Sequence, residues 1–283
     1  MRSLRAALAG TAASAALLLT ACGQSGAVDA VPGAVPYDGP LHVEVTAAPD
    51  DPTDDHGGAA GQAVDCDATP VGGSRSEPYD GGPVSRSPEA ALRRDSREAG
   101  PGGREGLREV RREADRVLYV DEVDGRTRHA AVVHRGRSVT GSTGWYLETW
   151  ARCDWAELPP AWAQEQGTEV WSDAAGHRVP TSRVQSSAGP AHCGWQDMTF
   201  LGLDGGDLDG GQTYVEHPDP AYYPDYFTVA YRRDADLPAD AVDTGYERGG
   251  RHLWLAPDAS RAFVGTRSSV AVWPRTVQPL GCA

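Results

Sequence analysis

Four of the five cysteines lie in the part of the chain that we expect to fold: Cys66, Cys153, Cys193 and Cys282. Their thiols could form disulfides or bind zinc. In a protein outside the cytosol, four cysteines predict two disulfides, with three pairings open. We favour Cys66–Cys153 and Cys193–Cys282, because each bond would then hold one half of the chain together. Zinc is the alternative, but the sequence has no Cys-x-x-Cys, and only His192 adjoins a cysteine.

Three carboxylates, Asp204, Asp207 and Asp209, lie in the glycine-rich run 204–211. Calcium prefers oxygen ligands on a backbone that can wrap around the ion. Their spacing matches neither an EF-hand nor a calcium β-roll, so we favour a solvated acidic turn and keep calcium as the alternative. We predict no other metal and no cofactor.

The sequence assigns no catalytic residue. The absence of lysine excludes P-loop, Schiff-base and Ser-x-x-Lys chemistry. The run 141–144 lacks the Gly-x-Ser-x-Gly elbow, and no His-Glu-x-x-His occurs. His129 and His134 could each meet an acid in the folded protein. Among the 40 acidic residues, a carboxylate pair of the glycosidase kind also stays open.

The N-terminal residues read as an export signal. Arg2 and Arg5 precede an uncharged stretch, residues 6–19, whose most apolar part is 15–19. Charge, apolar core and small residues follow in the order of a secretory signal. The apolar run is shorter than the roughly 20 residues that span a bilayer.

The signal ends in Leu19-Thr20-Ala21-Cys22, which resembles the lipobox of bacterial lipoproteins. That resemblance implies removal of residues 1–21 and diacylation, as by palmitate, of Cys22 as the mature N-terminus. Two acyl chains would hold the protein stably on a membrane, where one chain binds only marginally. We therefore expect a lipid anchor on the extracytoplasmic face of the cell membrane. The alternative is an ordinary signal peptide with Cys22 incidental.

Composition points to the source and excludes one class of partner. The chain has no Lys, Asn or Ile, which indicates a GC-rich genome and, with the lipobox, an actinobacterial cell envelope. The formal net charge of −14 becomes −16 without residues 1–21, whose charges are Arg2 and Arg5. We predict no nucleic-acid partner, because binding phosphates needs a basic face. The acyl chains, rather than charge, must hold the protein on the membrane.

Three segments should follow the signal peptide. Residues 22–62, rich in Gly, Ala, Pro and Asp, predict a flexible tether. Within them only residues 41–45 alternate as a strand does, and could join a sheet edge. Residues 63–158 and 159–283 form the first, α+β half and the second, β-rich half.

The first half predicts one helix packed on an antiparallel meander. Ser87-Pro88-Glu89 starts the helix as N-cap, first-turn proline and acid, and the glycines near residue 100 end it. Strands are expected over 116–123, 130–133 and 145–150. Asp124-Gly125 is a strong hairpin-turn signal between the first two.

The second half predicts a similar meander, through 253–255, 262–264 and 270–273, and we take the two as a weak internal repeat. Further expected elements are a hairpin at 170–179, a short helix at 193–201 and a strand at 226–231. The fold class is therefore α+β: antiparallel meanders, one or two short helices, two disulfides and two similar halves. The eight tryptophans should pack in the core, with a sugar-binding platform as the alternative.

Residues 117–123, 144–158 and 244–282 resemble those of actinobacterial lipoproteins and secreted proteins of unknown function. That resemblance implies no activity and no catalytic residue. The expected role is non-catalytic binding or envelope assembly, with an unknown envelope protein or glycan as partner. The alternative is a cell-envelope hydrolase that cleaves glycan or ester with a carboxylate pair. A transporter's solute-binding lipoprotein is disfavoured, because the sequence shows no repeated βαβ units.

Overall fold

The computed structural model describes residues 37–43, 57–75, 77–80, 82–95, 106–205, 211–217 and 225–278. The strands form three antiparallel sheets joined by a few short helices, which confirms the predicted α+β class. None of the helices in these ranges is long and apolar enough to cross a membrane. The signal peptide and Cys22 lie outside the described residues.

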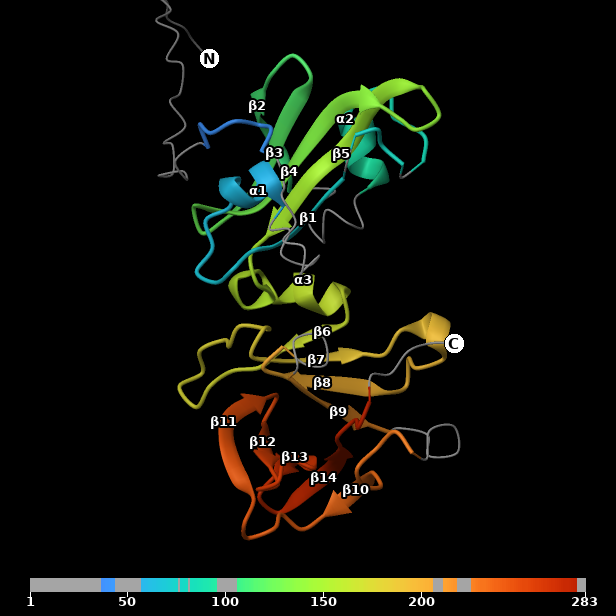
Figure 1. Cartoon of the computed structure of the whole chain (residues 1–283). Coiled ribbons are helices and arrows are strands. Elements are labelled where there is room, and N and C mark those ends of the chain that lie inside the picture. Colours follow the sequence, from blue (N-terminus) through green and yellow to red (C-terminus); the bar gives the residue numbers. More distant parts are fainter. Residues whose placement is uncertain are drawn as a thin grey trace, which may run out of the picture. The chain divides into compact units, whose positions relative to one another are not determined.

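The first sheet contains five strands in the order β1-β5-β4-β3-β2 (Figure 1). Its central hairpin turns at Asp124 and Gly125, whose φ angles of 53° and 76° are the left-handed values that a type I′ turn requires. The predicted hairpin is thereby confirmed. The strands are β1 (Val71–Ser74), β2 (Arg108–Arg112), β3 (Arg116–Val123), β4 (Arg126–Arg137) and β5 (Thr143–Arg152).

One short helix covers each face of this sheet. Side chains along a strand point alternately to the two faces. Leu118 therefore packs with the alanines of α1 (Gly58–Ala63), and Val117 packs with Ala91 and Leu92 of α2 (Pro88–Arg94). The start of α2 is as predicted, because the Ser87 hydroxyl accepts the Ala90 N–H at 3.2 Å. It ends earlier than predicted, at Arg94, with Asp95 as C-cap.

Part of the predicted tether belongs to the folded body. Residues 58–63 form α1, and Leu41 is 1 % exposed in the core cluster that contains Leu118. Residues 41–43 form no strand, so the part of the expected strand 41–45 that the structure describes is wrong. The reason is that Leu41 covers the apolar face of the sheet and does not extend its edge.

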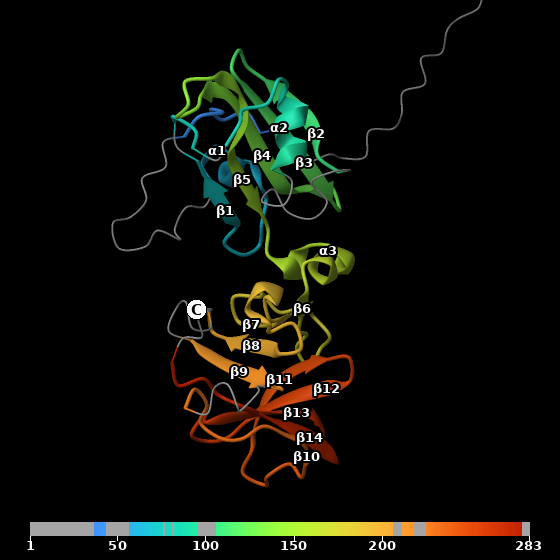
Figure 2. The same ribbon diagram turned by 90° about the vertical axis from the view of Figure 1, so that its right-hand side faces the viewer.

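The second half holds a four-stranded sheet in the order β6-β7-β8-β9 and a five-stranded sheet in the order β10-β14-β13-β12-β11. These two sheets lie against each other (Figure 2), and Trp171 and Tyr214 share a core with Leu253 and Trp273. The helices are η1 (Trp155–Glu157), α3 (Pro160–Glu165) and η2 (Ala191–Cys193). The strands are β6 (Thr168–Val170), β7 (Val184–Ala188), β8 (Thr199–Leu203), β9 (Gln212–Glu216), β10 (Arg232–Ala235), β11 (Val242–Arg248), β12 (Arg251–Leu255), β13 (Arg261–Thr266) and β14 (Ser269–Pro274).

The two five-stranded sheets have the same strand order. In each, the first strand pairs with the last strand of a four-stranded meander. The segments that resemble each other in sequence occupy equivalent places, since β3, β4 and β5 correspond to β12, β13 and β14. They differ in what covers them: helices pack on the first sheet, whereas the four-stranded sheet packs on the second.

Two elements expected in the second half are wrong. Residues 193–201 are no helix: η2 ends at Gly194, whose φ is 74°, and β8 begins at Thr199. Residues 226–231 form no strand, because only Phe227 makes a bridge, to Thr276. The hairpin near residue 175 is confirmed by the Val179 N–H, which donates to the Trp171 carbonyl at 2.9 Å.

Candidate functional site

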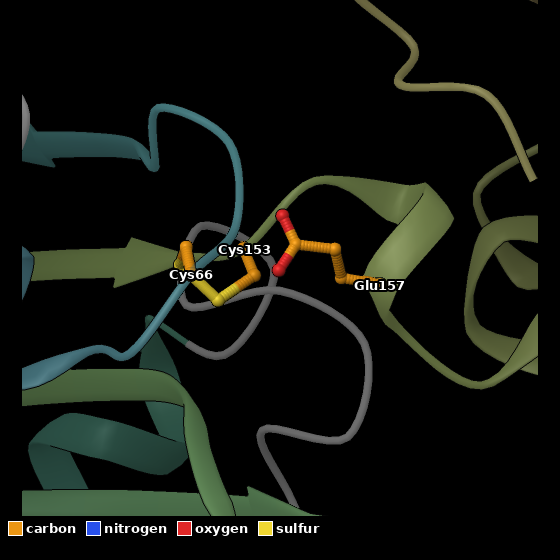
Figure 3. Close-up of side chains that lie close together, drawn as sticks. All are labelled: Cys66, Cys153 and Glu157. Carbon is orange, nitrogen blue, oxygen red and sulfur yellow. A yellow bond between two sulfur atoms is a disulfide. The ribbon is translucent and has the colours of Figure 1, made fainter.

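The predicted Cys66–Cys153 disulfide is present, with a Cα–Cα distance of 5.2 Å. The Glu157 side chain points towards it (Figure 3), and its carboxylate lies within 4.8 Å of both sulfur atoms. Zinc binds thiolates, and here the two sulfur atoms are bonded to each other. The group is therefore no zinc site in this state. The second predicted bond, Cys193–Cys282, stays a prediction, because Cys282 lies outside the described residues.

Glu157 supports the loop that carries Cys66. Its carboxylate accepts the Asp67 N–H at 2.7 Å and the Ala68 N–H at 3.0 Å. It also accepts a hydrogen bond from the Arg128 guanidinium, which reaches across from β4. The carboxylate is thus fully engaged in holding the loop to the end of β5.

A second group of polar side chains lies where β3 begins. Arg116, His134 and Tyr146 stand in register on the neighbouring strands β3, β4 and β5. The Arg116 guanidinium donates through Nε and Nη2 to the two oxygens of Glu148, at 2.8 and 2.9 Å. Its Nη1 donates to Asp115 at 2.8 Å. We call these five residues the polar cluster.

His134 is buried within the polar cluster, at 4 % exposed. Its Nδ1 lies 2.9 Å from the Tyr146 hydroxyl, and its Nε2 lies 3.4 Å from an Asp115 oxygen. Burial lowers the pKa of His134 and raises the pKa of Tyr146, so at neutral pH both groups are uncharged. The neutral ring is satisfied if the phenol donates to Nδ1 and Nε2–H faces the carboxylate.

One neighbour of the polar cluster comes from the N-terminal segment. The Nδ1 atom of His42 lies 3.2 Å from Glu148 Oε1, and its side chain is 61 % exposed. His42 follows Leu41, whose burial fixes the segment on the sheet. His42 therefore covers one side of the polar cluster.

An open pocket adjoins the polar cluster on another side. A Cβ atom on Gly136 would lie 2.9 Å from Glu77 Oε1 and 3.0 Å from His134 Cε1, so the glycine leaves room for the Glu77 carboxylate beside the imidazole. Beyond Glu77 the surface is hollowed by about 320 Å³. The lining residues are Glu77, Pro78, Arg137, Ser138, Val139 and Gly141.

The calcium prediction is mostly beyond what the structure describes, since Asp207 and Asp209 lie outside the described residues. Asp204 turns the chain after β8 with a φ of 48°, and its N–H donates to the Arg183 carbonyl. The tryptophans pack as predicted, because none of the eight is exposed and five are buried. This agrees with core packing and leaves no exposed tryptophan as a sugar platform.

Comparison with protein-family models, with curated proteins and with solved structures found no match. The site therefore has to be interpreted from its own geometry.

Of the polar cluster, sequence reasoning singled out only His134. The signal for the others was present in the strand alternation: Arg116 lies on the same face as Leu118, which is a core position. A polar residue at a core position of a strand needs a buried partner. Glu148 and Tyr146 could have been proposed as partners, because the predicted third strand places them on alternate positions of β5.

Proposed function

We propose that the protein is a lipoprotein held on the extracytoplasmic face of the cell membrane through Cys22, and that its folded body binds a ligand or assembles with an envelope partner without catalysis. The disulfide supports this compartment, since such bonds persist in oxidising surroundings and are rare in the cytosol. The signal segment and lipobox support the anchor.

The non-catalytic part of the proposal rests on the fact that both ring nitrogens of His134 already have partners. A general base must present an atom within hydrogen-bond reach of the substrate. His134 is buried, and its two ring nitrogens face Tyr146 and Asp115. Its role is to hold three strands together beneath the wall of an open pocket, as a binding site needs.

The hydrolase alternative requires two carboxylates that face each other across the substrate. Asp115 and Glu148, the two acids in the polar cluster, are instead bridged by the Arg116 guanidinium. The cation fills the place between these two acids that a substrate would need, so this pair does not fit the hydrolase.

The anchor is tested by growing cells with radiolabelled palmitate. The mature wild-type product should take up label and enter the detergent phase, whereas the Cys22→Ala variant should do neither. An unlabelled wild-type product would overturn the anchor. Purified wild-type protein should not turn over envelope glycan or model esters. Turnover of either substrate by the purified wild-type protein would replace the binding role with the hydrolase.

A further inference from the structure

The pocket beside the polar cluster has two charges on its wall. The Glu77 Oε1 atom accepts the backbone N–H of Arg137 at 3.1 Å. Within the ranges that the structure describes, neither the Glu77 carboxylate nor the Arg137 guanidinium makes an ion pair. One negative and one positive group are thus available to a molecule that enters the pocket.

The pocket lining also includes two apolar side chains. Pro78 follows Glu77, and Val139, which is 61 % exposed, comes two residues after Arg137. When Val139 packs against a small apolar group of a ligand, apolar surface of both is removed from water, which favours binding. The pocket therefore offers two opposite charges and a small apolar patch.

The wall is also held in place. The Tyr79 N–H donates to the Arg137 carbonyl at 2.8 Å, and the Val139 N–H donates to the Tyr79 carbonyl at 2.9 Å. The Tyr79 ring is buried and stacks on Tyr146 of the polar cluster, with ring centres 4.6 Å apart. A wall fixed before binding saves the entropy of ordering it.

We propose that this pocket binds a zwitterion of dipeptide size, with the ligand ammonium on Glu77, its carboxylate on Arg137 and a small side chain on Pro78 and Val139. This inference rests on the binding role proposed above and names the ligand class for that role. The volume lies at the lower end of the range for small-molecule sites.

Other ligand classes fit this wall less well. Among the described residues that line the pocket there is no aromatic ring to stack on a sugar, and their one carboxylate is too few for a dedicated calcium site. A simple anion would be repelled by Glu77, and a simple cation by Arg137. A molecule that carries both charges satisfies both residues.

The test is isothermal titration of the detergent-solubilised full-length protein with alanyl-alanine. N-acetyl-alanyl-alanine lacks the ammonium, and alanyl-alanine amide lacks the carboxylate. Saturable binding of alanyl-alanine is expected, and each analogue should bind at least about tenfold more weakly, because each loses one charge-assisted hydrogen bond. Absence of saturable binding by alanyl-alanine would overturn the proposal.

Two variants assign the contacts. Glu77→Gln should abolish the preference for the free ammonium, and Arg137→Gln the preference for the free carboxylate. Arg135→Gln is the matched control, since Arg135 is exposed on the same strand and does not line the pocket. Unchanged binding by both pocket variants would contradict the assignment. The palmitate experiment tests the anchor independently of the titration. A protein that takes up label and does not bind alanyl-alanine would therefore overturn this inference and leave the anchor intact.

Discussion

Arg116 of β3 and Glu148 of β5 form a two-pronged ion pair across the intervening strand β4, with Nε–Oε2 and Nη2–Oε1 distances of 2.8 and 2.9 Å. Both side chains are largely buried, at 13 % and 9 % exposed. His134 of β4 stands in register with Arg116. The pair therefore ties together the three central strands of the first sheet.

Replacing Glu148 should cost much more stability than replacing a surface acid. In Glu148→Gln the buried Arg116 guanidinium keeps only Asp115 as a counter-charge. The expected loss is about 3 kcal/mol, because the buried guanidinium keeps only a half-exposed counter-charge. Urea unfolding measures it. The control is Glu113→Gln, which breaks the ion pair between Glu113 and Arg111. Both side chains of that pair are more exposed than those of Arg116 and Glu148, so the variant should cost less than about 1 kcal/mol. Equal losses in the two variants would contradict the buried pair.

His134 should make the protein less stable in mild acid. Burial lowers its pKa from the ordinary value of 6.5, while Glu77, Asp115 and Glu148 oppose the shift and Arg116 adds to it. Below pH 6.5 the unfolded chain takes up a proton that the folded protein refuses. Stability is therefore full above that pH and falls as the pH drops through the lower folded pKa.

The variant His134→Gln should flatten this part of the pH profile in urea unfolding between pH 7.5 and the acid limit of folding. His177 provides the control, because its side chain is 80 % exposed and His177→Gln should leave the slope unchanged. If the free energy of unfolding of His134→Gln falls with pH as steeply as that of the wild type, other groups cause the loss of stability in acid.

The sequence predicted the meanders because their signals are local. Asp124-Gly125 determines a turn, and apolar alternation on either side determines which face is buried. The same logic aligned the two halves, and the sheets have the same strand order. The helix start at Ser87 was equally local, since an N-cap hydroxyl needs only the three residues that follow it.

The features that could not be predicted from the sequence depend on contacts between residues far apart in the chain. Leu41 looked like part of a strand, but it is buried in a core with Leu118 and Val132, which lie far along the chain. The polar cluster joins β3, β4 and β5 through partners that no spacing rule specifies. The pocket needs Gly136 opposite Glu77, which also depends on the register of distant segments.

Asp121 should be a site where a neutral residue stabilises the protein. Its Oδ2 atom is buried with no hydrogen-bond partner in the described structure, and burial raises the pKa of its carboxyl above the ordinary 3.8. A raised pKa means that the folded state prefers the protonated acid. Protonated Asp121 therefore contributes its full stability below pH 3.8, and this contribution is lost as the pH rises through the higher pKa of the folded state.

Asp121→Asn should therefore raise stability at pH 7 by about 1 kcal/mol, because it removes a poorly solvated charge. The gain should disappear as the pH is lowered towards 3.8. Asp124→Asn provides the control, since asparagine tolerates the left-handed turn position and the residue is exposed. Thermal unfolding at several pH values gives the comparison. A less stable Asp121→Asn protein at pH 7 would show that the charge has a partner after all.

Removing the Cys66–Cys153 bond should destabilise the protein strongly and yet leave its fold intact. The bond closes a loop with a sequence separation of 87, and on the chain-entropy model such a loop contributes about 4 to 5 kcal/mol. The double variant Cys66→Ala, Cys153→Ala should lose that amount in urea unfolding.

The folded form should persist because other bonds hold the same place. Glu157 still binds the Asp67 and Ala68 N–H groups, and the Asp65 N–H still donates to the Thr127 carbonyl at 2.7 Å. Hydrogen exchange should therefore show protected amides at residues 65, 67 and 68 in the double variant under native conditions. Adding Glu157→Gln should expose the amides of residues 67 and 68 and leave that of residue 65 protected. Loss of protection in the double variant alone would mean that the disulfide, and not Glu157, positions the loop.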